Sequence, residues 1–171
     1  CGKSLDLSWL AKRIDKVVGV ELVKRPVKEF FEENKLNYTI KSLGKFELFQ
    51  SDSIDIFNGD FFDLINQQTG RFDAIYDRAS IVSVEYKFRS KYVDHLMKFL
   101  VDGGKILLIT LEYDQDEMHG PPYSVPFLEL KNLFSENADL ELLETRDILD
   151  KRLREKGLSQ ILERVIQINK K

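Results

Sequence analysis

Short apolar runs alternate with amphipathic segments along the chain, and this pattern predicts strands that alternate with helices. In the first half, helical spacing of apolar residues predicts one helix after Ser4, a candidate N-cap, and another from Pro26 onward. The run Val17–Glu21 is typical of a buried strand. Phe46–Gln50 and Ile54–Asn58 alternate around a turn-like Ser-Asp-Ser and predict a hairpin or two edge strands.

The second half continues the same alternation. Strands are predicted over Phe72–Tyr76, Lys105–Leu111, Ala138–Glu144 and Ile161–Ile168. An amphipathic helix over Tyr92–Leu100 is expected to stop at Asp102-Gly103-Gly104, and a short helix is expected over Phe127–Phe134. The segment Lys105–Leu111 is apolar nearly throughout, so we expect it to be the central strand.

Strands that alternate with helices imply a parallel sheet covered on both faces. No clear amphipathic helix joins the last two strands, so we expect this C-terminal pair to be antiparallel. We therefore predict an α/β, Rossmann-like fold with a mostly parallel sheet. A length of 171 residues is enough for one such domain, expected to span residues 1–171.

Composition narrows the function classes. Hydrophobic residues make up 43% and charged residues 32%, a balance typical of a soluble globular domain. The net charge of −3 and the scattered basic residues disfavour a nucleic-acid partner, and the longest apolar run, Ile106–Leu111, is too short for a membrane span. Cys1, His95 and His119 are too few for a zinc cluster or a disulfide framework. We expect no metal and a reducing, cytoplasmic setting.

Ligands of open α/β sheets bind beyond the carboxyl ends of the strands, so polar residues at those ends are the candidates. Glu21 ends a predicted strand and can accept hydrogen bonds from the ribose hydroxyls of a nucleoside cofactor, although a solvated glutamate fits the pattern equally well. Asp60 can accept from an adenine amino group and Phe61 can pack on the ring. Taken alone, these two residues favour a turn followed by core phenylalanines.

For three further positions, the sequence is compatible with both a functional role and an ordinary surface role. Arg78 ends another strand and offers a planar fork of donors to a carboxylate, but an ion pair with Asp77 or Glu85 would explain it as well. The loop with Pro122 and Tyr123 follows the strongest strand and is either an acceptor-binding loop or a rigid turn. The basic residues at 151–154 are typical of a solvated face. Neither a Walker A loop nor a Gly-x-Ser-x-Gly elbow occurs.

In order and spacing, these segments resemble the motifs of the thiopurine S-methyltransferase family, most closely its bacterial branch. The matching segments are Cys1–Leu10, Val18–Glu21, Gly59–Phe62, Tyr76–Ala79, Gly120–Pro126, Arg146–Asp150 and Arg154–Leu158. The resemblance covers essentially the whole chain. Family members carry a further segment before the Cys-Gly-Lys motif, which includes a lid and the first strand, and we expect the full protein to have it.

The resemblance implies a class I methyltransferase fold. It implies methyl transfer from S-adenosyl-L-methionine, with S-adenosyl-L-homocysteine as product, to the sulfur of a thiopurine or a similar aromatic or heterocyclic thiol. Glu21 would hold the cofactor ribose, and Asp60 and Phe61 would line the adenine site. Arg78 would lie near the methionine carboxylate and the acceptor.

On the acceptor side, the resemblance implies that Pro122 and Tyr123 wall the pocket and that Arg152 is a second active-site arginine. The expected protein is a monomer with a small-molecule partner. The alternatives are another soft acceptor, such as a small thiol, a halide, or a selenium or tellurium species, and a non-catalytic nucleotide-binding protein. An NAD-dependent dehydrogenase is disfavoured because the glycine fingerprint is absent.

Overall fold

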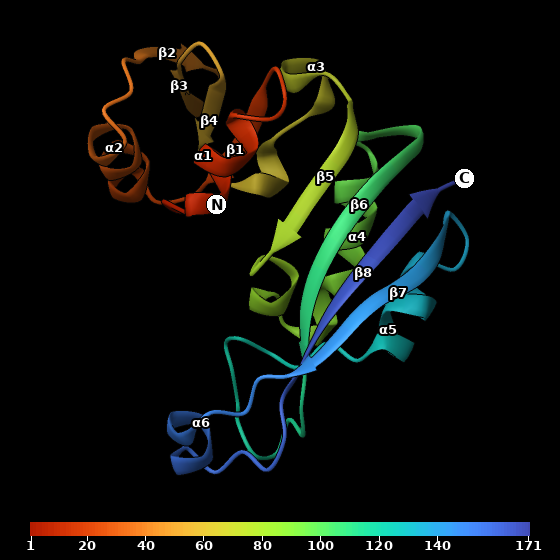
Figure 1. The fold of residues 1–171 in the computed structure, drawn as a ribbon. Helices are drawn as coiled ribbons and strands as arrows, with labels where there is room; N and C mark the ends of the chain where they lie inside the picture. Colours follow the sequence, from red (N-terminus) through yellow and green to blue (C-terminus); the bar gives the residue numbers. More distant parts are fainter. The chain divides into compact units, whose positions relative to one another are not determined.

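In the computed structural model, which describes residues 1–171, the chain folds as two units, Cys1–Thr69 and Gly70–Lys171. Figure 1 shows the ribbon of both units. Each unit contains a four-stranded sheet of its own.

The first unit is built on a sheet of strand order β1-β4-β3-β2. Its elements are α1 (Leu5–Ala11), β1 (Val17–Glu21), α2 (Lys24–Glu33), β2 (Thr39–Leu43), β3 (Phe46–Gln50), β4 (Ile54–Asn58), η1 (Phe61–Asp63) and α3 (Asn66–Thr69). Strand β1 pairs parallel with β4, whereas β2, β3 and β4 are antiparallel, as the short turns between them require. The predicted hairpin is therefore confirmed.

Aromatic side chains form the core of the first unit. Phe30 and Phe31 of α2 are fully buried and pack in one cluster with Phe49 of β3 and with Ile54 and Ile56 of β4. Strand β2 was not predicted, because all of its residues are exposed and its sequence shows no apolar alternation. Pairing with β3, rather than burial, makes it a strand.

Helix α1 begins where the sequence predicts, but it buries a partly different face. The Ser4 hydroxyl accepts a hydrogen bond from the Asp6 backbone N–H over 3.2 Å and so caps the helix. Leu7 is buried and Leu10 packs against the same core cluster, whereas Leu5 and Trp9, which share helical spacing with Leu10, are 81% and 56% exposed. Helical spacing correctly located the helix and Leu10, but it missed Leu7.

The second unit has a sheet of strand order β5-β6-β8-β7. Its elements are β5 (Phe72–Arg78), η2 (Ile81–Ser83), η3 (Tyr86–Phe88), α4 (Arg89–Met97), β6 (Leu100–Glu112), α5 (Phe127–Phe134), β7 (Ala138–Asp147), α6 (Lys151–Glu155) and β8 (Leu162–Lys170). Strand β6 lies between β5, which is parallel to it, and β8, which is antiparallel. The structure confirms both the predicted central strand and the predicted antiparallel C-terminal pair, β7 and β8.

The boundary between α4 and β6 differs from the prediction. The helix was expected to run to Leu100, but it ends at Met97 and the strand starts at Leu100. Leu100 is fully buried and pairs with Phe72, and Gly103 has a φ of +76° inside a register irregularity of the β5–β6 ladder. The glycine pair therefore bends a strand instead of ending a helix.

Alternation along β6 gives the sheet of the second unit two different faces. Ile106, Leu108 and Thr110 are buried, whereas Leu107 is 40% exposed. Helices α4 and α5 lie together behind the sheet in Figure 1. The residues between the buried ones, including Ile109 and Leu111, belong to the opposite face, and this face carries the site described below.

Replacing Gly59 by alanine is expected to destabilise the first unit. A Cβ at this position would lie 2.5 Å from the ring of Phe46, which is itself buried against Phe57. Overpacking of this kind typically costs about 1–3 kcal/mol, which thermal or urea unfolding would measure. In a Phe46→Leu background the same substitution should cost clearly less. An equal cost in both backgrounds would show that the contact with Phe46 is not the cause.

Candidate active site

Glu21, the last residue of β1, anchors the N-terminal turn. One carboxylate oxygen accepts from the Gly2 backbone N–H over 2.6 Å. The other oxygen accepts from the Val23 N–H over 2.9 Å. An ionised carboxylate has about four acceptor positions, so the oxygen bonded to Val23 keeps room for a further donor such as a hydroxyl.

These contacts also keep Glu21 ionised. Burial acts to raise the pKa of its carboxyl group, whereas the N–H donors of Val23 and Gly2 act to lower it and favour the ionised form. Glu21 is therefore an acceptor-only group at neutral pH. Such a group fits the ribose hydroxyls of a nucleoside cofactor.

Asp60 and Phe61 follow β4 at the same end of the first unit's sheet as Glu21, because β4 is parallel to β1 and Asn58 pairs with Glu21. The Asp60 side chain caps η1 by accepting from the Phe62 N–H over 2.9 Å. Asp60 is exposed, and neither Phe61 nor Phe62 is buried. The interpretation of this motif as a turn followed by two core phenylalanines is therefore wrong. The exposed Asp60 carboxylate lies next in sequence to the half-buried ring of Phe61.

The second unit contains a cavity of about 420 Å³ at the carboxyl ends of β5 and β6. Its lining residues are Arg78, Ala79, Val82, Ser83, Ile109, Leu111, Pro121, Pro122 and Glu163. Two of the predicted site residues, Arg78 and Pro122, are thus brought together. The lining is mainly apolar, with one guanidinium and one carboxylate, and its size suits a single small ligand.

Sequence reasoning missed most of this cavity. Alternation along β6 could have identified Ile109 and Leu111, since both lie opposite the buried face of that strand. Val82 and Ser83 come from η2, a short 3-10 turn with no periodic signal. Glu163 reaches the cavity because β8 pairs antiparallel with β6 and places it opposite Leu111, and no local motif reveals this register.

Tyr123 and Arg152 do not line the cavity. The Tyr123 backbone N–H donates to the Val82 carbonyl over 2.6 Å and so fastens the loop to η2. Arg152 is exposed on α6, whose Leu153 packs in the apolar cluster of Tyr113, Leu158 and Ile161. Figure 1 places α6 at the end of the second unit where β5 and β6 end. Contact of Arg152 or the Tyr123 side chain with an acceptor therefore stays a prediction.

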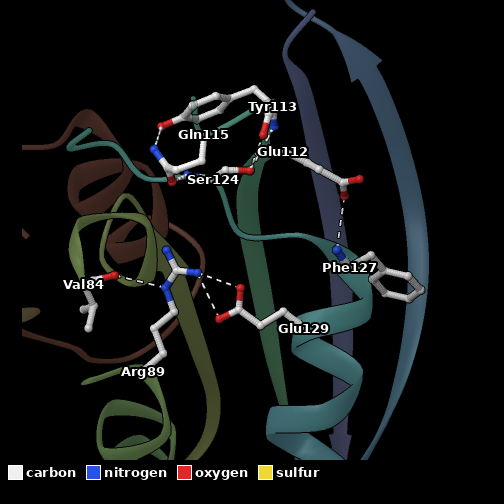
Figure 2. Close-up of polar contacts among 8 residues, drawn as sticks. All are labelled: Val84, Arg89, Glu112, Tyr113, Gln115, Ser124, Phe127 and Glu129. Atoms are coloured by element: carbon white, nitrogen blue, oxygen red, sulfur yellow. Dashed lines mark hydrogen bonds and ion pairs between the residues drawn. The ribbon is translucent and has the colours of Figure 1, made fainter. Parts of the chain in front are cut away.

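A buried ion pair supports one wall of the cavity. Arg89, 2% exposed, donates through Nη1 to both carboxylate oxygens of Glu129 over 2.9 and 2.7 Å, and through Nε to the Val84 carbonyl over 3.0 Å. Figure 2 shows these contacts between the two side chains. They tie the segment after η2 to α4 and α5, and both charges are satisfied by directed hydrogen bonds.

A second set of contacts holds the loop after β6. The Ser124 hydroxyl donates to the Tyr113 carbonyl over 2.7 Å and accepts from the Tyr113 N–H over 3.0 Å. The Tyr113 hydroxyl donates to the Pro122 carbonyl. The Glu112 carboxylate accepts from the Phe127 N–H at the start of α5, as Figure 2 shows. These hydrogen bonds hold the two ends of the loop that carries Pro121 and Pro122 close together.

Asp77 positions the turn that follows Arg78. Its side chain is buried and accepts from the Tyr92 hydroxyl over 2.7 Å and from the Ile81 N–H over 3.3 Å. Ala79 lies between Asp77 and Ile81 in the sequence and has a φ of +64°. Non-glycine residues adopt this left-handed conformation only where their surroundings impose it. Burial raises the pKa of Asp77, and the hydrogen bonds offset part of this effect.

Comparison with known proteins decides the family. The sequence model of Thiopurine S-methyltransferase (TPMT) matches residues 1–171. The chain is 45% identical over 172 residues to the thiopurine S-methyltransferase of Vibrio atlanticus, covering 98% of this chain and 77% of that protein. The chain belongs to the thiopurine S-methyltransferase family. The resemblance inferred from the motifs is confirmed.

Solved structures show the same fold for this family member. YcgJ from Bacillus subtilis has a TM-score of 0.70 at 11% identity, covering 99% of this chain and 88% of that one. The N-methyltransferase NodS from Bradyrhizobium japonicum, in complex with S-adenosyl-L-homocysteine, has a TM-score of 0.67 at 13% identity, covering 99% and 74%. The predictions of a Rossmann-like class I methyltransferase and of S-adenosylmethionine as its cofactor are confirmed. The prediction of mostly parallel strands is wrong, because only the β1–β4 and β5–β6 pairs are parallel and the other four pairs are antiparallel.

Two further observations bear on other predicted properties of this thiopurine S-methyltransferase family member. None of its helices has both the length and the apolar character that a membrane span requires. No group of three or more His, Cys, Asp or Glu side chains is placed to hold a metal ion.

Breaking the Arg89–Glu129 pair is expected to destabilise the protein strongly. Arg89→Met leaves the Glu129 carboxylate without its partner and should lower the free energy of unfolding by about 3–5 kcal/mol, and Glu129→Met should have a similar effect. The double variant should lose much less than the sum, because no unpaired charge remains. Urea unfolding of the four proteins measures this, and additive losses would contradict a coupled pair.

Asp77 is expected to make stability fall as pH rises. Since burial raises its pKa in the folded chain, the folded state binds this proton more tightly than the unfolded state. Its contribution is therefore present below the unfolded pKa, about 3.9, and is lost as pH rises through the raised folded value. Asp77→Asn should flatten this part of the stability curve, whereas Asp73→Asn, at an exposed position of the same strand, should not. Identical curves for wild type and Asp77→Asn would contradict it.

Proposed function

We propose that this protein transfers the methyl group of S-adenosylmethionine to the sulfur of a thiopurine or a similar aromatic or heterocyclic thiol. The observation that carries the acceptor assignment is the cavity of the second unit, about 420 Å³ in volume, mainly apolar and with the Arg78 guanidinium in its lining. A flat aromatic thiol matches apolar walls, and a thiolate matches a cation. Halides and other small ions need far less space and no apolar surface. The relatives' name, thiopurine S-methyltransferase, supports the same acceptor class.

The residues present fit the cofactor. When bound, S-adenosylmethionine supplies an activated methyl group on a sulfonium centre. Glu21 has room for a further donor on one oxygen and would accept a hydrogen bond from a ribose hydroxyl. Exposed Asp60 would accept from an amino group, the Phe61 ring would pack on the adenine, and the Arg78 fork would suit the carboxylate.

Methyl transfer to such a thiol does not require a strong general base. An aromatic heterocyclic thiol is acidic enough to be largely thiolate near neutral pH, so a strong base is not needed. Arg78 stabilises the anion, and Ile109, Leu111 and Pro122 exclude water from the sulfur. Holding the nucleophile in line with the methyl carbon supplies much of the rate acceleration, because it replaces a bimolecular encounter by a positioned reaction. In this proposal Arg152 and Tyr123 act on the acceptor side.

The remaining properties belong to the same proposal. We expect a monomer that folds as one domain and works in the cytoplasm, with no nucleic-acid or membrane partner. The net charge of −3, the scattered basic residues and the single cysteine support this.

The two arginines are expected to behave differently. Arg78→Ala should weaken S-adenosylmethionine binding and slow methyl transfer to 6-mercaptopurine, by about 10- to 100-fold for a lost charged hydrogen bond. Arg78→Lys should restore only part of the loss, because a point charge lacks the planar fork. Arg152→Ala should leave cofactor affinity nearly intact and lower turnover. Calorimetry with S-adenosylhomocysteine and steady-state kinetics provide the two measurements.

Arg154→Ala, a change of the other exposed arginine on α6, is the matched control and should alter neither quantity. If Arg152→Ala loses cofactor binding while Arg78→Ala keeps it, the roles are assigned wrongly. A wild-type protein that binds the cofactor but methylates no aromatic thiol would overturn the acceptor class itself.

A further inference from the structure

The cavity contains a carboxylate that the proposed chemistry does not use. Glu163 of β8 lines the same cavity as Arg78. Methyl transfer to a thiolate needs no proton acceptor, and a carboxylate repels an anionic sulfur. A second charge of opposite sign in a small, mainly apolar cavity therefore requires a different explanation.

Glu163 is not explained by a structural ion pair. It makes no hydrogen bond and no ion pair within the chain, although it is half-buried, and it interacts with Arg146 only through charge attraction. Its cross-strand neighbour on β7 is Arg146, but the Nε of Arg146 pairs with Glu144 over 2.5 Å and its side chain is 64% exposed. A half-buried carboxylate without a hydrogen-bond partner is costly to desolvate, and its acceptor positions are available to a ligand.

The strand register separates the two charges of the cavity. Arg78 of β5 lies opposite Ile109 of β6, and Glu163 of β8 lies opposite Leu111, two residues further along β6. Strands β5 and β8 flank β6, so their backbones are roughly 10 Å apart, twice the spacing of neighbouring strands. Ile109 and Leu111 form the apolar floor between the two ends. The cavity is thus bipolar, with a cation at one end and a carboxylate at the other.

A ligand that satisfies both ends is a flat heterocycle with sulfur on one side and an N–H on the other. An ionised carboxylate only accepts hydrogen bonds, so Glu163 requires a donor. We propose that Glu163 is a specificity-determining residue that accepts a hydrogen bond from a ring N–H of a heterocyclic thiol whose sulfur lies toward Arg78. This inference rests on the proposed function and adds a preference, among aromatic thiols, for those with a ring N–H.

The test compares two acceptors that differ in this donor. 6-Mercaptopurine keeps an imidazole N–H in its thiolate form, and thiophenol has none. Glu163→Leu should lower kcat/KM for 6-mercaptopurine by about tenfold or more, as expected for a lost hydrogen bond to a charged group, and leave kcat/KM for thiophenol unchanged or raised. Glu163→Gln has the same shape and an acceptor oxygen, so it should shift the ratio in the same direction by a smaller factor. Glu141→Leu, at an exposed position of β7, should not shift it.

The ratio of the two kcat/KM values separates specificity from structure. Equal losses for both acceptors in Glu163→Leu would show a structural role, and an unchanged ratio in both Glu163 variants would show no role in recognition. Either result overturns the inference while wild-type turnover of both thiols upholds the proposed function. A wild-type protein that methylates neither thiol overturns both.

Discussion

The site in the second unit depends on the buried pair of Arg89 and Glu129. Removing two charges from water is costly, and this cost is offset by the contact of Nη1 with both Glu129 oxygens and of Nε with the Val84 carbonyl. These directed bonds fix α4, α5 and the segment after η2 relative to one another. The cavity wall formed by Val82 is attached to that frame, and the Tyr123 N–H in turn fastens the proline loop to Val82.

The period of a strand assigns neighbouring residues to different tasks at the end of β5. Asp77 points into the buried face, where Tyr92 and the turn of η2 hold it, while Arg78 lines the cavity on the opposite face. Burial holds the pKa of Asp77 above its usual value, and its position sets the backbone from which Arg78 extends. Asp77 therefore supports the structure and Arg78 lines the cavity, and the two adjacent side chains lie on opposite faces of the sheet.

The sequence predicted what local patterns encode. The apolar run at Lys105–Leu111 identified the central strand, and strand ends correctly pointed to Arg78 at a cavity. Arg89 could not be identified, because a charged residue at the start of a helix is usually a surface residue, and its burial depends on Glu129 about 40 residues later. Glu163 depends on the β6–β8 register. Long-range pairing, rather than composition, placed both.

Strand β2 has a consequence for behaviour at high concentration. It is the last strand of its sheet, all of its residues are exposed, and it carries apolar Ile40 and Leu43, so its outer backbone groups offer a template to another chain. Lys41 lies between these two residues, with its ammonium bonded to Gln50. A strand added alongside β2 would have to pack against this lysine. The edge thus carries its own gatekeeper against aggregation.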